Sequence, residues 1–72
     1  MKPDADGLLI EGRLHSRSGD FDRALAVFRK IIDTWPKDIR GWEEIALVYE
    51  KKNVPDMAAV FREKAAGLKK KK

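Results

Sequence analysis

Apolar residues recur along this chain at helical spacing in four separate segments. The clearest is 21–34, where apolar positions follow one another at steps of three, one, three, three and one, as on one wide helix face. Faces of the same kind occur in 5–17, in 39–52, and from Pro55 to Leu68, where Gly67 and the lysines after it are expected to end the helix. No segment alternates apolar and polar residues as a half-buried strand does. The pattern therefore predicts four helices and no sheet.

Residues that favour helix termini stand between the four segments. Gly19 and Asn53 can adopt the left-handed conformation that closes a helix, so they are expected to end the first and third helices. Pro36 stops the second helix, and Pro55 suits the first turn of the fourth because its missing N–H is not needed there. Aspartate side chains can accept hydrogen bonds from the free N–H groups that begin a helix. The candidate caps are Asp4 or Asp6, Asp20 and Asp38.

An interval of 34 residues relates the first two predicted helices to the last two. The pairs of similar residues at that interval are Ala24 with Ala58, Leu8 with Trp42, Gly12 with Ala46, His15 with Tyr49, and Ile31 with Ala65. The chain therefore contains two copies of one helical hairpin, at about 5–38 and 39–68. A polar leader at 1–4 precedes them, and a lysine tail at 69–72 follows.

In this register, residues 5–68 resemble the tetratricopeptide repeat family, whose pattern is W-x2-L-G-x2-Y, then A-x3-F, then P, over about 34 residues. The residues that carry the resemblance are Gly12, Ala24, Phe28 and Pro36 in the first copy, and Trp42, Ile45, Ala46, Tyr49 and Ala58 in the second. The resemblance implies an all-α fold of two stacked antiparallel helical hairpins, a fragment of an α-solenoid. Small Gly12 and Ala46 would let the helices of a hairpin approach closely. Phe28, Trp42 and Tyr49 would pack at the junction of the hairpins.

The two copies depart from the family pattern at opposite ends of the chain. In the first copy Leu8, Glu11 and His15 stand where the family has Trp, Leu and Tyr. In the second copy, Leu25, Phe28 and Ile32 are replaced at the same interval by Ala59, Arg62 and Ala66. Smaller or more polar outer faces are typical of capping repeats, so these changes favour a complete two-hairpin unit. Because Leu9, Ile10 and Trp35 have no clear partner in a monomer, self-association as a homo-oligomer remains an alternative.

The resemblance also implies a concave surface, formed by the first helix of each hairpin, that binds a peptide or helix of a partner protein. The residues expected there are Leu9, Ile10, Arg13, Arg17, Arg40, Glu43, Leu47, Glu50 and Lys51. Their arginines could receive acidic groups, because guanidinium forks suit carboxylates. An ordinary solvated helix face is the alternative. Trp35 is either an exposed anchor for the partner or a packing residue.

Few residues of the chain suit catalysis or metal binding. With no cysteine and one histidine, disulfides and a zinc site of nitrogen and sulfur ligands are excluded. No serine, cysteine or lysine shows a nucleophile constellation with His15. Adjacent Glu43 and Glu44 diverge by about 100° around a helix, so they form no acid–base pair. We expect a non-catalytic binding module or adaptor, without cofactor or metal.

The basic charge of the chain lies at its C-terminal end. The formal net charge is +4, and Lys69–Lys72 account for it, because the remaining basic residues balance the 12 acidic ones. No apolar run reaches the roughly 20 residues of a membrane span, and we expect a cytoplasmic protein. The tail leaves one further function open, a small nucleic-acid- or ribosome-associated protein. We regard nucleic-acid binding as the weaker hypothesis, because no aromatic residue is interleaved with the lysines.

Overall fold

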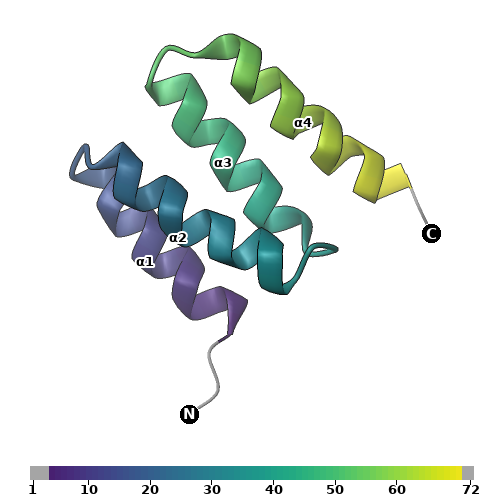
Figure 1. Cartoon of the computed structure of the whole chain (residues 1–72), viewed down its shortest axis with the longest axis horizontal. Coiled ribbons are helices and arrows are strands. Elements are labelled where there is room, and N and C mark those ends of the chain that lie inside the picture. Colours follow the sequence, from purple (N-terminus) through teal and green to yellow (C-terminus); the bar gives the residue numbers. More distant parts are fainter. Residues whose placement is uncertain (1–3, 71–72) are drawn as a thin grey trace.

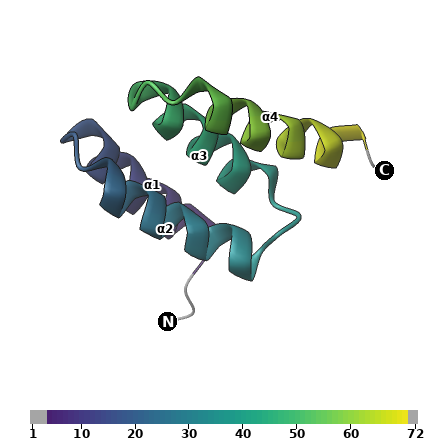
Figure 2. The same cartoon turned by 45° about the horizontal axis from the view of Figure 1, so that its top comes forward.

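The computed structural model describes residues 4–70, which form four helices joined by short turns. They are α1 (Ala5–Arg17), α2 (Phe21–Thr34), α3 (Ile39–Lys51) and α4 (Pro55–Lys70). Helices α1 and α2 form one antiparallel hairpin, and α3 and α4 form the other (Figure 1). The hairpins stack side by side, with α1 and α4 on opposite sides of a flat molecule of 36 × 35 × 14 Å (Figure 2). The predicted all-α fold of two hairpins is confirmed.

Aspartate caps begin the first three helices. The Asp4 carboxylate accepts a hydrogen bond from the Gly7 N–H at 2.7 Å, which decides between Asp4 and Asp6 as the first cap. Asp20 accepts from the Arg23 N–H at 3.3 Å, and Asp38 accepts from the Arg40 N–H at 3.0 Å. These bonds satisfy backbone donors that have no partner within the helix.

The turns within the two hairpins both use a left-handed residue, as predicted. Gly19 has a φ of 85° and Asn53 a φ of 63°. Glycine adopts this conformation without penalty and asparagine tolerates it, so each turn reverses the chain in few residues.

The fourth helix does not end at Gly67, and this prediction was wrong. Helix α4 continues to Lys70, so Lys69 and Lys70 are helical rather than part of a tail. Glycine in a helix costs only about 1 kcal/mol relative to alanine, and it ends a helix only where the backbone turns left-handed. Gly67 does not do so. Lys71, Lys72 and the first three residues lie outside the described residues.

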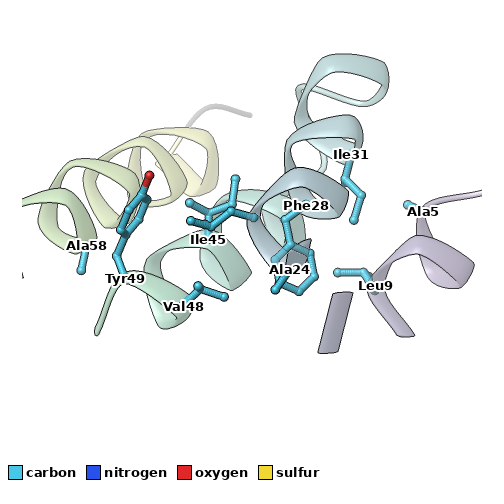
Figure 3. Packing of buried hydrophobic residues seen from close by; sticks show 10 residues of the cluster. Ala5, Leu9, Ala24, Phe28, Ile31, Ile45, Val48, Tyr49 and Ala58 are labelled. Carbon is cyan, nitrogen blue, oxygen red and sulfur yellow. The ribbon is translucent and has the colours of Figure 1, made fainter. Parts of the chain in front are cut away.

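The core lies along the seam between the hairpins. The side chains of Phe28, Ile31 and Ile45 are fully buried, and Figure 3 shows Phe28 between Leu9 of α1 and Ile45 of α3. The phenyl ring of Phe28 rests on Gly12 so closely that a Cβ atom added there would lie 2.6 Å from Cζ and 2.8 Å from Cδ1. A bare backbone on α1 therefore makes room for the largest core side chain of α2.

A second close approach joins the two hairpins at Gly41. A Cβ atom added at Gly41 would lie 2.9 Å from the Cγ2 atoms of both Ile31 and Ile32. The family pattern did not indicate Gly41. Its role becomes visible only when α3 is placed against α2.

The aromatic residues of the second hairpin stack on one another. The rings of Trp42 and Tyr49 both stack on Phe61 of α4, with centroids 5.8 and 5.7 Å away. Tyr49 also reaches the first hairpin, since its hydroxyl accepts a hydrogen bond from Arg29 at 3.3 Å. Trp42 was expected to fill the space beside the preceding hairpin. Its ring stacks within its own hairpin, and its indole N–H donates at 2.9 Å to the carbonyl of Pro36, in the turn that joins the two hairpins.

Candidate functional site

An open groove of about 390 Å³ runs between α1 and α3, the first helices of the two hairpins. Its walls are Arg13, Ser16 and Arg17 from α1, and Glu44, Leu47, Val48 and Lys51 from α3. The hairpin stack brings these two segments together from positions about 31 to 35 residues apart in sequence. Four of these residues, Arg13, Arg17, Leu47 and Lys51, were expected on the concave face.

An ion pair spans the groove. The Arg13 guanidinium donates from Nε to the Glu44 carboxylate at 2.9 Å and donates to the same oxygen from a terminal nitrogen. This hydrogen bond and the charge of Glu44 raise the pKa of Arg13 above its ordinary value. Glu44 is largely covered, with 14% of its side chain exposed, so the carboxylate needs this cation as a partner. Arg13 is therefore already neutralised and is not a free receptor for an acidic ligand.

Arg40 is also ion-paired with carboxylates of the chain itself. It donates to the Asp38 carboxylate at 3.0 Å from Nε and at 2.7 Å from a terminal nitrogen, and it pairs with Asp6 of α1. The hydrogen bonds from Arg40 hold the pKa of the Asp38 carboxyl below its usual range. The same two carboxylates raise the pKa of Arg40. This cluster closes one end of the seam between α1 and α3.

Two cations of the groove have no carboxylate partner in the described part of the chain. Within residues 4–70, neither Arg17 nor Lys51 forms a salt bridge with a carboxylate. Lys51 donates to the Ser16 hydroxyl at 3.5 Å, which places ammonium and hydroxyl side by side. Leu47 lies in the same groove with 45% of its surface exposed. The end of the groove beside Arg17 thus offers two cations, a hydroxyl and an apolar contact.

The predicted glutamates lie on the other side of α3, towards α4. Glu43 pairs with Lys69 at 3.3 Å, and Glu50 pairs with Arg62. These two residues therefore do not line the groove between α1 and α3. Ile10 does not line it either, although it is 60% exposed on α1.

Leu9 was wrongly expected on the accessible face. Only 3% of it is exposed, and it belongs to the core together with Ala5. The reason is helical geometry, because Leu9 lies four residues after Ala5 and three before Gly12, on the face of α1 that is buried. Its neighbour Ile10 points about 100° away from it around the helix.

Trp35 packs against the core rather than standing exposed. Its side chain is partly buried against the hydrophobic cluster, and its backbone N–H donates to the Ile31 carbonyl at 2.7 Å at the end of α2. Of the two interpretations of this residue, the exposed anchor was wrong and packing is supported.

Sequence reasoning missed Ser16, Glu44 and Val48 as members of the groove. Ser16 lies three residues after Arg13, and residues three apart share one face of a helix. A helical projection could therefore have placed Ser16 beside Arg13. Val48 gives no such signal, because a valine beside Leu47 fits the core equally well, and it is 1% exposed.

Other chemistry is sparse in the described part of the chain. No three histidine, cysteine, aspartate or glutamate side chains gather there as a metal site requires. Nor is any helix of residues 4–70 long and apolar enough to cross a bilayer.

Comparison with protein families agrees with this geometry. The family model described as tetratricopeptide repeat matches residues 5–48, which is more than half of the chain. The chain belongs to the tetratricopeptide repeat family. The match covers α1, α2 and most of α3, and α4 completes the second repeat in the structure. No curated protein matches the chain closely enough to count as a relative. Tetratricopeptide repeats generally mediate protein–protein interaction and typically serve as non-catalytic scaffolds.

Proposed function

We propose that this tetratricopeptide repeat protein binds an acidic peptide segment of a partner protein in the groove between α1 and α3. The observation that carries the proposal is the pair of cations, Arg17 and Lys51, that have no carboxylate partner within residues 4–70. Ser16 and exposed Leu47 lie in the same groove. A segment with a carboxylate beside an apolar side chain matches all four groups.

The size and charge of the groove define the expected mode of binding. A volume of about 390 Å³ holds a few side chains and is too small for a folded partner. Charge-assisted hydrogen bonds to Arg17 and Lys51 would orient the carboxylate. Because both cations face solvent, salt is expected to weaken binding, since the Debye length is about 8 Å at physiological ionic strength.

Direct binding to short synthetic peptides tests this proposal. Fluorescently labelled peptides that contain one leucine and either glutamates, glutamines or lysines are titrated with the purified chain. We expect only the glutamate peptide to bind, and the Arg17→Glu and Lys51→Glu variants to weaken it by about tenfold each, as loss of a charged hydrogen bond predicts. Lys30→Glu is the matched control, because Lys30 is exposed on α2 and does not line the groove. Equal binding of the three peptides, or an equal loss with Lys30→Glu, would refute the proposal.

This function assigns no catalytic residue. We also propose a cytoplasmic location, which the absence of cysteines supports because the cytoplasm is reducing. The alternative of nucleic-acid binding depends on the C-terminal lysines. Lys69 pairs with Glu43 at 3.3 Å, so part of that charge is neutralised within the fold. Salt-sensitive RNA binding that disappears on deletion of 69–72 would favour the alternative.

A further inference from the structure

Three large apolar side chains are exposed on the first helices of the two hairpins. Ile10 and Leu14 on α1 are 60% and 58% exposed, and Leu47 on α3 is 45% exposed. In the 34-residue register, Leu14 occupies the position of Val48, which is 1% exposed because it packs in the core. The outer face of α1 thus carries an apolar residue where α3 uses one for packing.

The packing between the two hairpins shows how one repeat receives the next. Three polar contacts join α1 to α3, namely Asp6 with Arg40, Arg13 with Glu44, and Ser16 with Lys51. Two more join α2 to the second hairpin, Arg29 with Tyr49 and Asp22 with Lys52. The first of these contacts spans 34 residues, one repeat. The same contacts can be shifted by one repeat. The residue of the first hairpin is then replaced by the residue 34 positions later, and the residue of the second hairpin by the residue 34 positions earlier in a second copy. The resulting pairs would meet if α1 of the second copy packed on α3 and α4.

The shifted pairs of the first helices are complementary. The contact of Arg13 with Glu44 becomes a contact of Leu47 with Ile10 of the second copy, two side chains that are exposed in the monomer. The contact of Ser16 with Lys51 becomes one of Glu50 with Arg17, which have opposite charges, so Arg17 of the second copy would join the existing ion pair of Glu50 with Arg62. The contact of Asp6 with Arg40 becomes one of Arg40 with Asp6 of the second copy, so the two charges remain opposite. None of the three places like charges or a charge against an apolar residue.

The shifted contacts of the second helices are also compatible. The bond of Arg29 with Tyr49 becomes one of Glu63 with His15, a carboxylate facing an imidazole. The close approach of Gly41 to Ile31 and Ile32 becomes Gly7 against Ala65 and Ala66. Gly7 is exposed, and a Cβ atom there would meet only the cap Asp4, so its bare backbone is open to a neighbouring helix.

We propose that copies of this chain associate head to tail, with α1 of one copy packed on α3 and α4 of the next as α3 packs on α1 and α2. Such an interface is heterologous, so it produces a ring or an open helical stack rather than a closed symmetric dimer. Because Leu25, Phe28 and Ile32 are replaced by Ala59, Arg62 and Ala66 at this interface, it buries less apolar surface than the contact within the chain. Association should therefore be reversible and depend on concentration.

The test uses two variants that each damage one end of the unit. Ile10→Lys places a charge on the α1 face, and Leu47→Lys places one on the α3 face. Met57→Lys is the matched control, because Met57 is 37% exposed but aligns with Arg23, whose ion pair is with Asp20 of its own hairpin. Circular dichroism establishes that each variant folds, and sedimentation velocity of the purified chain over a range of concentrations measures association.

The expected results are specific to a head-to-tail interface. The original chain and Met57→Lys form species that grow with concentration, whereas Ile10→Lys and Leu47→Lys are each monomeric. An equimolar mixture of these two variants forms a heterodimer and nothing larger, because one intact α3 face meets one intact α1 face. A monomeric original chain at every concentration, association of either folded variant alone, or a monomeric mixture would overturn the proposal. Since no peptide is present, these results are independent of the proposed peptide binding.

Discussion

The contact between Gly12 and Phe28 makes a sharp prediction about stability. A methyl group added at Gly12 would lie 2.6 Å from Cζ and 2.8 Å from Cδ1 of Phe28, and closer still to Cε1. Real carbon atoms do not approach so closely, so α1, α2 or the ring must move. Phe28 has no exposed surface, and the ring therefore has no open space into which it could turn.

Two opposing effects set the size of the change for Gly12→Ala. Replacing a helical glycine by alanine gains about 1 kcal/mol of helix stability. Overpacking a filled core costs about 1–3 kcal/mol, and the short distances at Gly12 favour the upper part of that range. We expect the free energy of unfolding to fall by about 1–2 kcal/mol, a large part of the roughly 3–5 kcal/mol that a core of this size provides.

Urea and thermal unfolding followed by circular dichroism measure this change. A loss of about 1 kcal/mol should lower the melting temperature by about 4–8 °C in a domain of this length. Gly67→Ala is the matched control, because it makes the same substitution in a helix where nothing lies within 4 Å of the new atom. We expect the control to be neutral or to raise stability by up to about 0.5 kcal/mol, since it lies near the end of α4.

A double-mutant cycle separates the steric cost from the helix propensity. In a Phe28→Leu background the ring is absent, so Gly12→Ala should cost about 1 kcal/mol less than it does in the original chain. If Gly12→Ala were as stable as the original chain, or if its cost were the same in both backgrounds, the close packing of α1 on α2 would be refuted.

Three further predictions concern helix ends. Asp38→Ala should lower stability by about 1 kcal/mol through loss of the cap. Because the folded-state pKa of Asp38 is depressed, this difference in stability is present above about pH 4 and disappears as the pH falls through the folded pKa. Unfolding curves at several pH values measure it. Gly19→Ala should cost about 1 kcal/mol because φ is 85°, whereas Asn53→Gly at φ 63° should cost nothing, and urea midpoints compare the two. Trp35→Ala should reduce stability by less than the roughly 3–5 kcal/mol of a fully buried tryptophan and should leave peptide binding unchanged, since Trp35 packs on the core outside the groove.

Most of the fold could be predicted because its signals are local. The bounds of α1 and α2 agree with the predicted helices, and Asp4, Asp20 and Gly19 act at the ends where their chemistry suggested. The end of α4 could not be predicted in the same way. Glycine near a run of lysines is a stop signal only when the next residues turn away, and nothing in the composition distinguishes that case from a helix that continues.

The candidate site was predicted less completely because it depends on which side chains pair. Leu8, Leu9 and Ile10 are three successive apolar residues that cover a wide arc of a helix, and only packing decides which of them is buried. Arg13 was expected to be available for a ligand. Its carboxylate partner Glu44 comes from another helix, and the spacing within one helix cannot reveal such a partner.

The same 34-residue interval that predicts the fold also explains where the surfaces differ. Two positions carry a small residue in both copies, because the helices of each hairpin meet there. They are Gly12 with Ala46, and Ala24 with Ala58. Arg13 aligns with Leu47 and Ile10 with Glu44, so these positions repeat in place but not in chemistry. The packing of the helices does not require these positions to differ between the copies. We therefore attribute the difference to the separate partners that the α1 face and the α3 face contact. The surface of a short repeat protein is therefore best interpreted from the positions at which its copies disagree.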